Sequence, residues 1–467
     1  MSIALGSIIP GLAGLDGIVQ ENALERMFRD PLYQSLQYRD EAKREKWAAN
    51  IGEVSIQTRR SLLEIRTKPL TPGTDPTPQN TKFEQFEVQA AQHSDTTDTN
   101  MPANRTALAS TFLEDAEALG LQAGATLNRV ARNRLYSAYL SGNSIANGAG
   151  AATTVLVVNT INGFTDTFSG TRRVPVSPST PLAITVGGVA ANVVAAAPAD
   201  SDFPTGPGTL TLEANTTWAD GAAVVANDAP RILRAGNVTT VDGLTATSAL
   251  KLSPIQKAIS LLRTSRVPKH SDGKYHVHLD PQGEHQIFQD NQFQRLNQSL
   301  PDGMRYQEYM IGNLLGSYFQ TNDESPNDET MSTENTIGDG LVASGRGSEI
   351  IGRDICAPVR NASGARILRA IVTGGGCLLE KYIDESEYLS EAGVQGKIGN
   401  FNVTNNGMQI NLDGIRYILR SPQDRLQQVV SHTWSWSGGW TAPTDLLGGK
   451  GGAQFKRAVV VEFAVDG

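Results

Sequence analysis

Four polar side chains in the middle of the chain have the residue types of a metal site. His276 and His278 lie two residues apart in an apolar segment that we expect to be a strand, so both should project from one face. Asp280 and His285 follow closely. The spacing matches no zinc motif, however, and it fixes no acidic third ligand. We therefore interpret these histidines as ordinary core or surface residues.

Two glycine-rich segments have the composition of an anion-binding loop or of a bend that exposes a nucleophile. In 447–453, LGGKGGA, freed backbone amides could hold a phosphate, but a Walker A motif needs Ser or Thr after the Lys and here Gly451 follows. Glycines 374–376 precede Cys377, yet no His is close in sequence, so a bend at a strand end is favoured.

Aromatic and acidic clusters complete the candidates for chemistry. Closely spaced indoles could stack nucleobases, but no Lys or Arg lies between Arg425 and Lys450, which favours packing or a subunit contact for Trp434, Trp436 and Trp440. The acids after Cys377 are interpreted as a solvated edge: Glu380, Asp384 and Glu385. Neither a nucleophile elbow nor HExxH occurs. The sequence thus predicts no catalytic, metal-binding or cofactor-binding residue, no cofactor and no enzyme.

Composition limits the class of protein. A chain of 467 residues exceeds what one core usually serves, so we expect two or three domains. With 40 Lys and Arg against 48 Asp and Glu, the net charge of −8 argues against broad nucleic-acid binding, although it does not exclude enclosing DNA. The cysteines, Cys356 and Cys377, lack CxxC spacing, which suits reduced thiols. No signal peptide or membrane span is indicated at the N-terminus.

The elements that must position all these side chains are organised around a long predicted helix, 106–142. Its apolar positions step by three or four along one stripe: Leu108, Phe112, Ala116, Leu119, Ala123, Leu127 and Val130. At 1.5 Å per residue the helix would span about 50 Å. Gly120 and Gly124 weaken it by about 1 kcal/mol each relative to Ala. Another part of the chain, or another chain, must bury the stripe.

Two segments precede this helix. In residues 1–50 the charged run 39–46 is interpreted as a solvated helix face within an extended arm. In residues 51–105 two stretches of period two, around Val54 and Phe86, flank the proline-rich segment 68–78, which predicts a long hairpin with a projecting tip. An isolated hairpin is marginally stable, so we expect this one to lie on the same chain or a neighbouring one.

The composition changes twice after the helix. Residues 155–236 contain no Lys, His, Cys or Met, and short apolar runs alternate with turn signals. This pattern predicts a small all-β sandwich or barrel over 150–236. Helices and strands then alternate through 237–467, which indicates an α+β region.

The order of these parts, with three short segments, resembles a known family. The segments are His278-Leu-Asp-Pro281, the helix with Phe288 and Phe293, and the glycine-punctuated 311–321, in which Gly312 and Gly316 would allow tight turns. The sequence resembles the major capsid proteins of tailed bacteriophages with the HK97-type fold, and the N4-like and P22-like coat proteins in particular. The resemblance implies an N-arm (1–50), an E-loop hairpin (51–105), a spine helix (106–142) and peripheral and axial domains (237–467). The block 150–236 would be an inserted Ig-like β-sandwich.

The resemblance also implies a function in assembly. The chain would self-assemble as pentamers and hexamers into an icosahedral capsid that encloses double-stranded DNA without sequence-specific binding. Its partners would be neighbouring capsid subunits, with portal, scaffolding and cement proteins, and no membrane. It would be a virion component assembled in the host cytoplasm. Two alternatives are an encapsulin-like compartment shell and a carbohydrate-binding adhesin or tail component that uses the β insertion.

Overall fold

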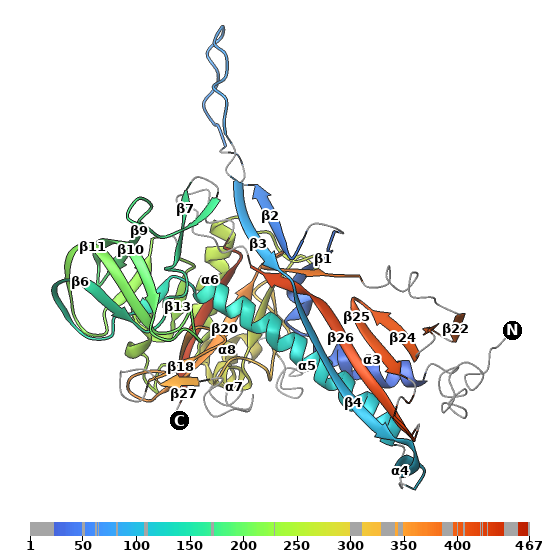
Figure 1. Ribbon diagram of the computed structural model, residues 1–467. Coiled ribbons are helices and arrows are strands. Elements are labelled where there is room, and N and C mark those ends of the chain that lie inside the picture. The colour runs from blue at the N-terminus through green and yellow to red at the C-terminus, as the bar shows by residue number, and fades with distance from the viewer. Residues whose placement is uncertain are drawn as a thin grey trace. The chain divides into compact units, whose positions relative to one another are not determined.

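The chain divides into two compact units in the computed structural model. Unit 1 comprises Met1–Ser55, Val88–Ala131 and Leu379–Trp440, and unit 2 comprises Ile56–Glu87, Arg132–Leu378 and Thr441–Gly467. The structure describes residues 23–48, 52–60, 63, 65–80, 83–106, 111–169, 172–227, 229–298, 311–327, 341–343, 349–384, 396–398, 400–404, 407–420, 422, 424–426, 428–442 and 456–465. Figure 1 labels the main elements of both units.

The predicted long helix is α5, Thr111–Leu140, and a short helix α4, Met101–Thr106, precedes it. Residues 107–110, and with them Leu108, lie outside the described residues. The predicted stripe is buried at Phe112, Ala116, Leu119, Ala123 and Leu127. The boundary between the two units falls inside α5, since unit 1 ends at Ala131 and unit 2 resumes at Arg132.

Unit 1 combines the first part of α5 with a sheet and a second helix. Its strands follow the order β1-β21-β26-β25-β24-β23-β22, and β4 pairs with β26. The bounds are α3 Ala23–Ser35, β1 Ala42–Lys46, β4 Ala91–Asn100, β21 Leu378–Tyr382, β22 Gly396–Ile398, β23 Phe401–Thr404, β24 Gly407–Leu412, β25 Ile415–Arg420 and β26 Val429–Thr441. Within this unit α5 contacts the sheet, because Trp434 Nε1 donates to Gln122 Oε1 at 3.3 Å.

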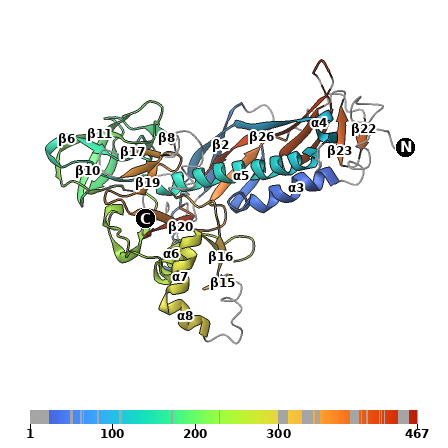
Figure 2. The same ribbon diagram turned by 90° about the horizontal axis from the view of Figure 1, so that it is seen from below.

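Helix α3 lies against α5 (Figure 2), and the contact is at Gly120 and Gly124, the glycines that lower the helix propensity of α5. A Cβ at Gly120 would overlap the carbonyl oxygen of Phe28, and one at Gly124 would lie 2.7 Å from that of Leu32. One turn further on, the side-chain oxygen of Asn128 accepts from the backbone N–H of Tyr38 at 2.7 Å. The glycines therefore permit a backbone approach that no other residue allows.

The predicted extended arm is wrong for the described part of residues 1–50. Residues 23–35 form helix α3, whose Leu24, Phe28 and Leu32 are fully buried. The charged run is not a helix face either, because residues 42–46 form the edge strand β1. Charge alternation along the run resembled a solvated helix, but strand pairing decided its conformation. Residues 1–22 lie outside the described residues.

The predicted hairpin is confirmed as strands β2, Val54–Arg60, and β3, Phe83–Gln89, which form a two-stranded sheet. The proline-rich tip contains no strand, and residues 65–78 are all exposed. Arg59 anchors the hairpin base, since its Nη2 donates to the carbonyl oxygen of Gly376 at 2.9 Å and its guanidinium lies 5.3 Å from the centre of the Phe86 ring.

Of the two predicted forms of the β block, sandwich or barrel, the structure has a closed sheet, and the Ig-like sandwich is not found. Its six strands follow the order β5-β12-β9-β10-β11-β6, and a bridge between Ala146 and Val158 joins the two end strands. The bounds are β5 Asn143–Ile145, β6 Gly150–Val158, β9 Leu182–Val186, β10 Val189–Pro198, β11 Gly208–Trp218 and β12 Ala223–Ala226, with a separate pair β7 Asp166–Ser169 and β8 Arg172–Pro175. One enclosed core, which includes Leu156, Ile184 and Leu210, replaces the two stacked layers of an Ig-like domain.

The rest of unit 2 is a nine-stranded sheet with helices. The path is β15-β16-β14-β20-β19-β18-β17, and β27 pairs with β20 and β13. The bounds are β13 Ile232–Arg234, α6 Leu252–Thr264, β14 Tyr275–Leu279, α7 Pro281–Gln289, α8 Asn291–Gln298, β15 Asn313–Leu314, β16 Ser317–Thr321, β17 Leu341–Ala343, β18 Ile350–Gly352, β19 Ala357–Arg360, β20 Arg366–Thr373 and β27 Ala458–Val465. Gly312, directly before β15, and Gly316, in the β15–β16 turn, take positive φ values of 62° and 73°, as the predicted tight turns require.

The glycine contact gives a prediction that contradicts helix propensity. An exposed Gly→Ala change within a helix is stabilising by about 1 kcal/mol. Gly120→Ala in α5 should instead destabilise unit 1 by about 1–3 kcal/mol, because the new Cβ meets the Phe28 carbonyl. Urea unfolding followed by tryptophan fluorescence measures it. Ala118→Gly, at an exposed position of the same helix, is the control and should cost about 1 kcal/mol. A stabilised Gly120→Ala variant would contradict the packing.

Candidate assembly surface

The four residues with metal-ligand types do not surround one point. His276 stacks on His270, with ring centres 4.2 Å apart, and its Nε2 lies 3.0 Å from Asp272 Oδ2. His278 is fully buried on the same strand. Asp280 is the N-cap of α7 and accepts from the Gln282 N–H at 2.9 Å.

His285 is exposed on α7, where its Nε2 lies 2.8 Å from Gln289 Nε2. Each of the four side chains thus has its own surroundings.

The glycines before Cys377 form a bend at a strand end, as predicted. Strand β20 ends at Thr373, Gly376 has a φ of +73°, and β21 begins at Leu378. Cys377 is fully buried, and its carbonyl oxygen accepts from Tyr139 Oη at 3.0 Å. Neither cysteine forms a disulfide. The segment 447–453 lies outside the described residues.

The three tryptophans are buried and do not form an exposed stacking surface. Trp434 and Trp436 are each 1% exposed and Trp440 is 7% exposed. Trp436 and Trp440 stack with ring centres 5.5 Å apart. Packing, one of the two favoured interpretations, is what the structure has.

The acidic edge predicted around Glu380 is wrong at Glu380 itself. This carboxylate is fully buried and paired with the equally buried Arg39, with Nη2 2.6 Å from Oε1 and Nε 2.9 Å from Oε2. Arg39 Nη2 also donates to the carbonyl oxygen of Asp413 at 2.8 Å. Asp384 forms an ion pair with Lys46 at 2.5 Å, and Glu385 lies outside the described residues. The partner of Glu380 is 341 residues away in sequence, so no local sequence pattern predicts the ion pair.

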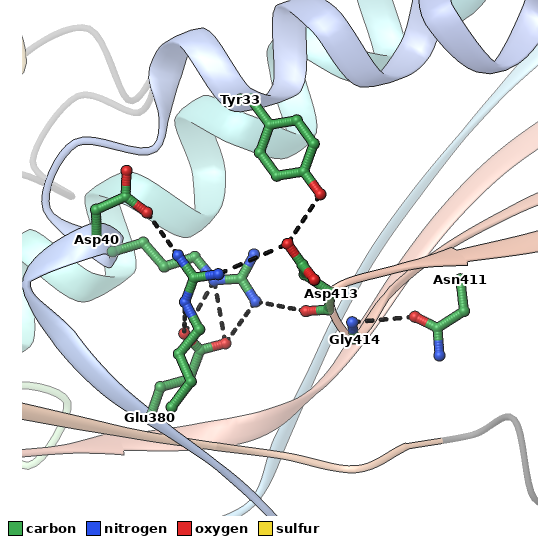
Figure 3. Close-up of polar contacts among 8 residues, drawn as sticks. Tyr33, Asp40, Glu380, Asn411, Asp413 and Gly414 are labelled. Atoms are coloured by element: carbon green, nitrogen blue, oxygen red, sulfur yellow. Dashed lines mark hydrogen bonds and ion pairs between the residues drawn. The ribbon is translucent and has the colours of Figure 1, made fainter.

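A shell of further polar contacts surrounds this pair and ties residues 33–44 to the β24–β25 turn (Figure 3). Tyr33 Oη donates to Asp413 Oδ2 at 2.9 Å. Burial, with help from that carboxylate, raises the pKa of Tyr33 to about 12. Arg44 lies 3.7 Å from Asp413 Oδ2 and 3.9 Å from Glu380 Oε2. We call this group the N-terminal clamp, because it fixes the segment that follows α3.

A buried histidine lies beneath α5 in unit 1. His432 is fully buried, its Nδ1 is 2.6 Å from Tyr417 Oη, and the Phe112 ring packs edge-on against it at 4.6 Å. Burial lowers its pKa to about 4, although Asp115 and Asp98 oppose the shift. His432 is not among the residues predicted from the sequence, where its signal is a polar residue within an otherwise apolar face of β26.

The hairpin presents its apolar residues to solvent. On β2 the predicted face of Val54, Ile56 and Thr58 is the exposed one, whereas Ser55 is buried. The exposed apolar side chains are Val54 (45%), Ile56 (61%), Leu63 (51%), Ile65 (68%), Leu70 (59%) and Phe83 (40%). We call this set the hairpin apolar surface. Such a concentration of exposed apolar side chains on one hairpin is typical of a protein-binding surface.

No helix among the described residues is both long enough and apolar enough to cross a membrane.

The chain was compared with known families, proteins and structures. No protein-family model matches it, and no curated protein does. It is similar to the capsid of Ralstonia phage GP4, at 13% identity and a TM-score of 0.46 over 91% of this chain and 88% of that one. It is similar to the capsid of cyanophage P-SCSP1u, at 9% identity and 0.47 over 92% and 88%. It is also similar to the capsid asymmetric unit of cyanophage Pam1, at 8% identity and 0.47 over 90% and 87%.

The N-terminal clamp gives a prediction about buried charge. Glu380→Gln leaves the buried Arg39 without its counter-charge and should lower the free energy of unfolding by about 3–5 kcal/mol. The double variant Arg39→Met/Glu380→Met removes both charges and should cost less than Glu380→Gln. Urea unfolding measures the three proteins. Lys43→Met, which breaks the exposed pair of Lys43 with Glu45, is the control and should stay within about 1 kcal/mol. Equal effects of Glu380→Gln and Lys43→Met would refute the clamp.

His432 gives a prediction about pH. Its pKa is about 4 in the fold and 6.5 unfolded, so the folded state excludes the proton. The stability it contributes is complete above pH 6.5 and is lost as pH falls toward 4, by about 3 kcal/mol in all. Wild type should therefore lose stability relative to His432→Gln between pH 7 and pH 4 in urea unfolding. The exposed His285→Gln variant should keep the wild-type pH profile. Parallel profiles for wild type and His432→Gln would contradict the assignment.

Proposed function

We propose that the chain is the major capsid protein of a tailed bacteriophage, a structural subunit that self-assembles as pentamers and hexamers. The closed shell would enclose the double-stranded DNA genome. The order of elements supports this proposal: a hairpin, a 30-residue helix and then an α+β region follow one another as the resemblance implies. Portal, scaffolding and cement proteins as partners, and assembly in the host cytoplasm, belong to the same proposal.

The hairpin apolar surface is the observation that carries the proposal. Full burial of a side chain such as Ile or Leu contributes about 1.5–3 kcal/mol, so leaving several of them in water is costly. The proline-rich tip cannot extend a sheet of its own chain, because proline lacks the N–H donor. A second copy that receives the hairpin removes this apolar area from water. In a closed symmetric shell every subunit would both give and receive one hairpin.

The units suggest how the remaining parts contribute. We assign unit 1, with α3, α5 and the sheet around β26, to the peripheral domain, and the nine-stranded sheet of unit 2 to the axial domain. The closed sheet of residues 143–226 would then be the insertion. Each contact between copies can be modest, because many simultaneous contacts make dissociation of a closed shell rare.

The direct test is electron microscopy of the expressed full chain. Closed shells of regular size are the expected result, in the presence of scaffolding protein if it is required. Shells that contain packaged enzyme instead of DNA would favour the encapsulin-like alternative, and trimeric fibres would favour the adhesin. A chain that stays monomeric under all scaffolded and unscaffolded conditions would overturn the proposal.

The hairpin gives a prediction about assembly. Ile56→Asp places a charge in the hairpin apolar surface and should abolish shells or lower their yield at least tenfold, since burying an unpaired carboxylate is costly. The unassembled chain should unfold as wild type does, because Ile56 is exposed within it. Sedimentation and negative stain measure the yield. Leu426→Asp, at an exposed aliphatic side chain outside the hairpin (73%), is the matched control and should assemble normally. Normal shells from Ile56→Asp would show that the hairpin is not the contact.

A further inference from the structure

One segment of this acidic chain is strongly basic. Residues 251–274, which include helix α6, contain six Lys and Arg residues and one Asp, whereas the whole chain has a net charge of −8. The basic residues are Lys251, Lys257, Arg263, Arg266, Lys269 and Lys274. The segment lies within unit 2, and Figure 2 labels α6 beside α7.

The cations of α6 and its ends point outward. Lys251, Lys257, Arg263 and Arg266 are all exposed. Among the described residues, none of these four side chains has an ion-pair or hydrogen-bond partner. We call these four residues the α6 basic surface. Their charges are therefore available to a ligand, unlike those of Arg39 or Arg369, which are buried in ion pairs.

Helix electrostatics does not account for this arrangement. Cations at a helix C-terminus are favourable, which would explain Arg263 and Arg266, but a cation at the N-terminus is unfavourable by about 0.3–1 kcal/mol. Lys251 is nevertheless the N-cap of α6, its side chain forms no capping hydrogen bond, and the first turn contains no acidic residue. The carboxylate of Asp290, from the end of α7, already lies at this N-terminus, and a bound anion beside Lys251 would add to its effect.

A groove of about 570 Å³ lies beside the same lysines. Its walls include Lys251, Lys257 and the turn through Asn237. Arg234 also lines it, but this guanidinium is already paired with Glu462 at 2.8 Å. Asp290, the C-cap of α7, accepts from the Leu252 N–H at 2.9 Å through Oδ2, so this carboxylate is held at the N-terminal end of α6. Two unpaired ammonium groups remain for a ligand.

The neighbouring side chains on α6 distinguish between kinds of polyanion. The exposed positions between the cations are polar, namely Ser253, Gln256, Ser260 and Thr264, and no large apolar side chain of α6 is exposed. Protein interfaces usually have apolar or aromatic anchors at their centre. A surface of cations and hydroxyls without such anchors suits a phosphate backbone better.

We propose that the α6 basic surface binds the phosphate backbone of duplex DNA without regard to sequence. The assignment to DNA rests on the proposed function, in which the shell encloses a DNA genome. From Lys251 to Arg263 the surface extends about 18 Å at 1.5 Å per residue, the length of about five base pairs. One subunit contacts at most four phosphates, so the DNA affinity of a single subunit is low. The many copies in a shell would therefore hold the DNA without immobilising it.

The test uses the unassembled full chain and a fluorescent 30-base-pair duplex of random sequence. Lys251→Gln/Lys257→Gln should bind at least tenfold more weakly than wild type at 50 mM salt. The slope of log K against log salt should become less steep by about 1.8, since two phosphate contacts are lost. Both lysines are exposed and unpaired among the described residues, so the urea midpoint should not change.

Two comparisons make the test decisive. Arg295→Gln/Arg425→Gln removes two exposed cations elsewhere and should leave the affinity and the slope close to wild type. Equal losses in both double variants, or no loss in the α6 variant, would overturn the inference. Tighter binding of polyglutamate than of DNA by wild type would replace DNA with an acidic polypeptide as the partner. Shell formation is scored separately by microscopy, so regular shells with unchanged DNA binding would defeat this inference and leave the proposed function intact.

Discussion

The close approach of α3 to α5 is the constraint on which unit 1 depends. Two glycines one helical turn apart let the backbone of α3 sit where side chains would normally hold two helices apart. Phe28 then stacks on Tyr417 of the sheet, with ring centres 4.6 Å apart. The segment after α3 then lies against the sheet, where Arg39 forms an ion pair with Glu380. Each glycine destabilises the helix by about 1 kcal/mol relative to Ala, and this packing offsets that cost.

Buried charge fixes direction more than it adds stability. Desolvating an ion pair costs about as much as the pair returns, so Arg39 and Glu380 do not make unit 1 exceptionally stable. What they provide is one register, because any other placement of residues 39–46 leaves two charges buried and unpaired. The same logic holds in unit 2, where Glu462 is shared by Arg369 at 2.9 Å and Arg234 at 2.8 Å. That shared carboxylate fixes β13 and β20 on either side of β27.

The two exposed surfaces differ in the physics they use. The hairpin apolar surface would gain by leaving water, an effect that is short in range and insensitive to salt. The α6 basic surface would act through charge, which salt screens over about 10 Å. A subunit that uses apolar burial for its neighbours and weak, screened charge for its contents would build a durable wall without fixing what it encloses. The acidic balance of the rest of the chain is consistent with that division.

Local pattern alone determined the elements whose cause is local. The 3.6-residue spacing of apolar side chains specified α5, the prolines of 68–78 specified the strand-free tip, and the glycines before Cys377 specified a bend. Each rests on backbone dihedrals or on periodicity within one segment. The resemblance to capsid proteins came from the order of these same elements.

Tertiary structure decided whatever depends on a distant partner. Residues 42–46 of the charged run form a strand because β21 pairs with them. Glu380 is a core residue because Arg39, 341 positions away in sequence, lies opposite it. The β block closed on itself because Ala146 reaches Val158, a pairing that alternation within single strands cannot specify. Gly120 and Gly124 lower the helix propensity of α5, and only the contact with α3 gives the reason for glycine at these positions. Sequence period determines which face of an element is apolar, but only the assembled fold determines what that face meets.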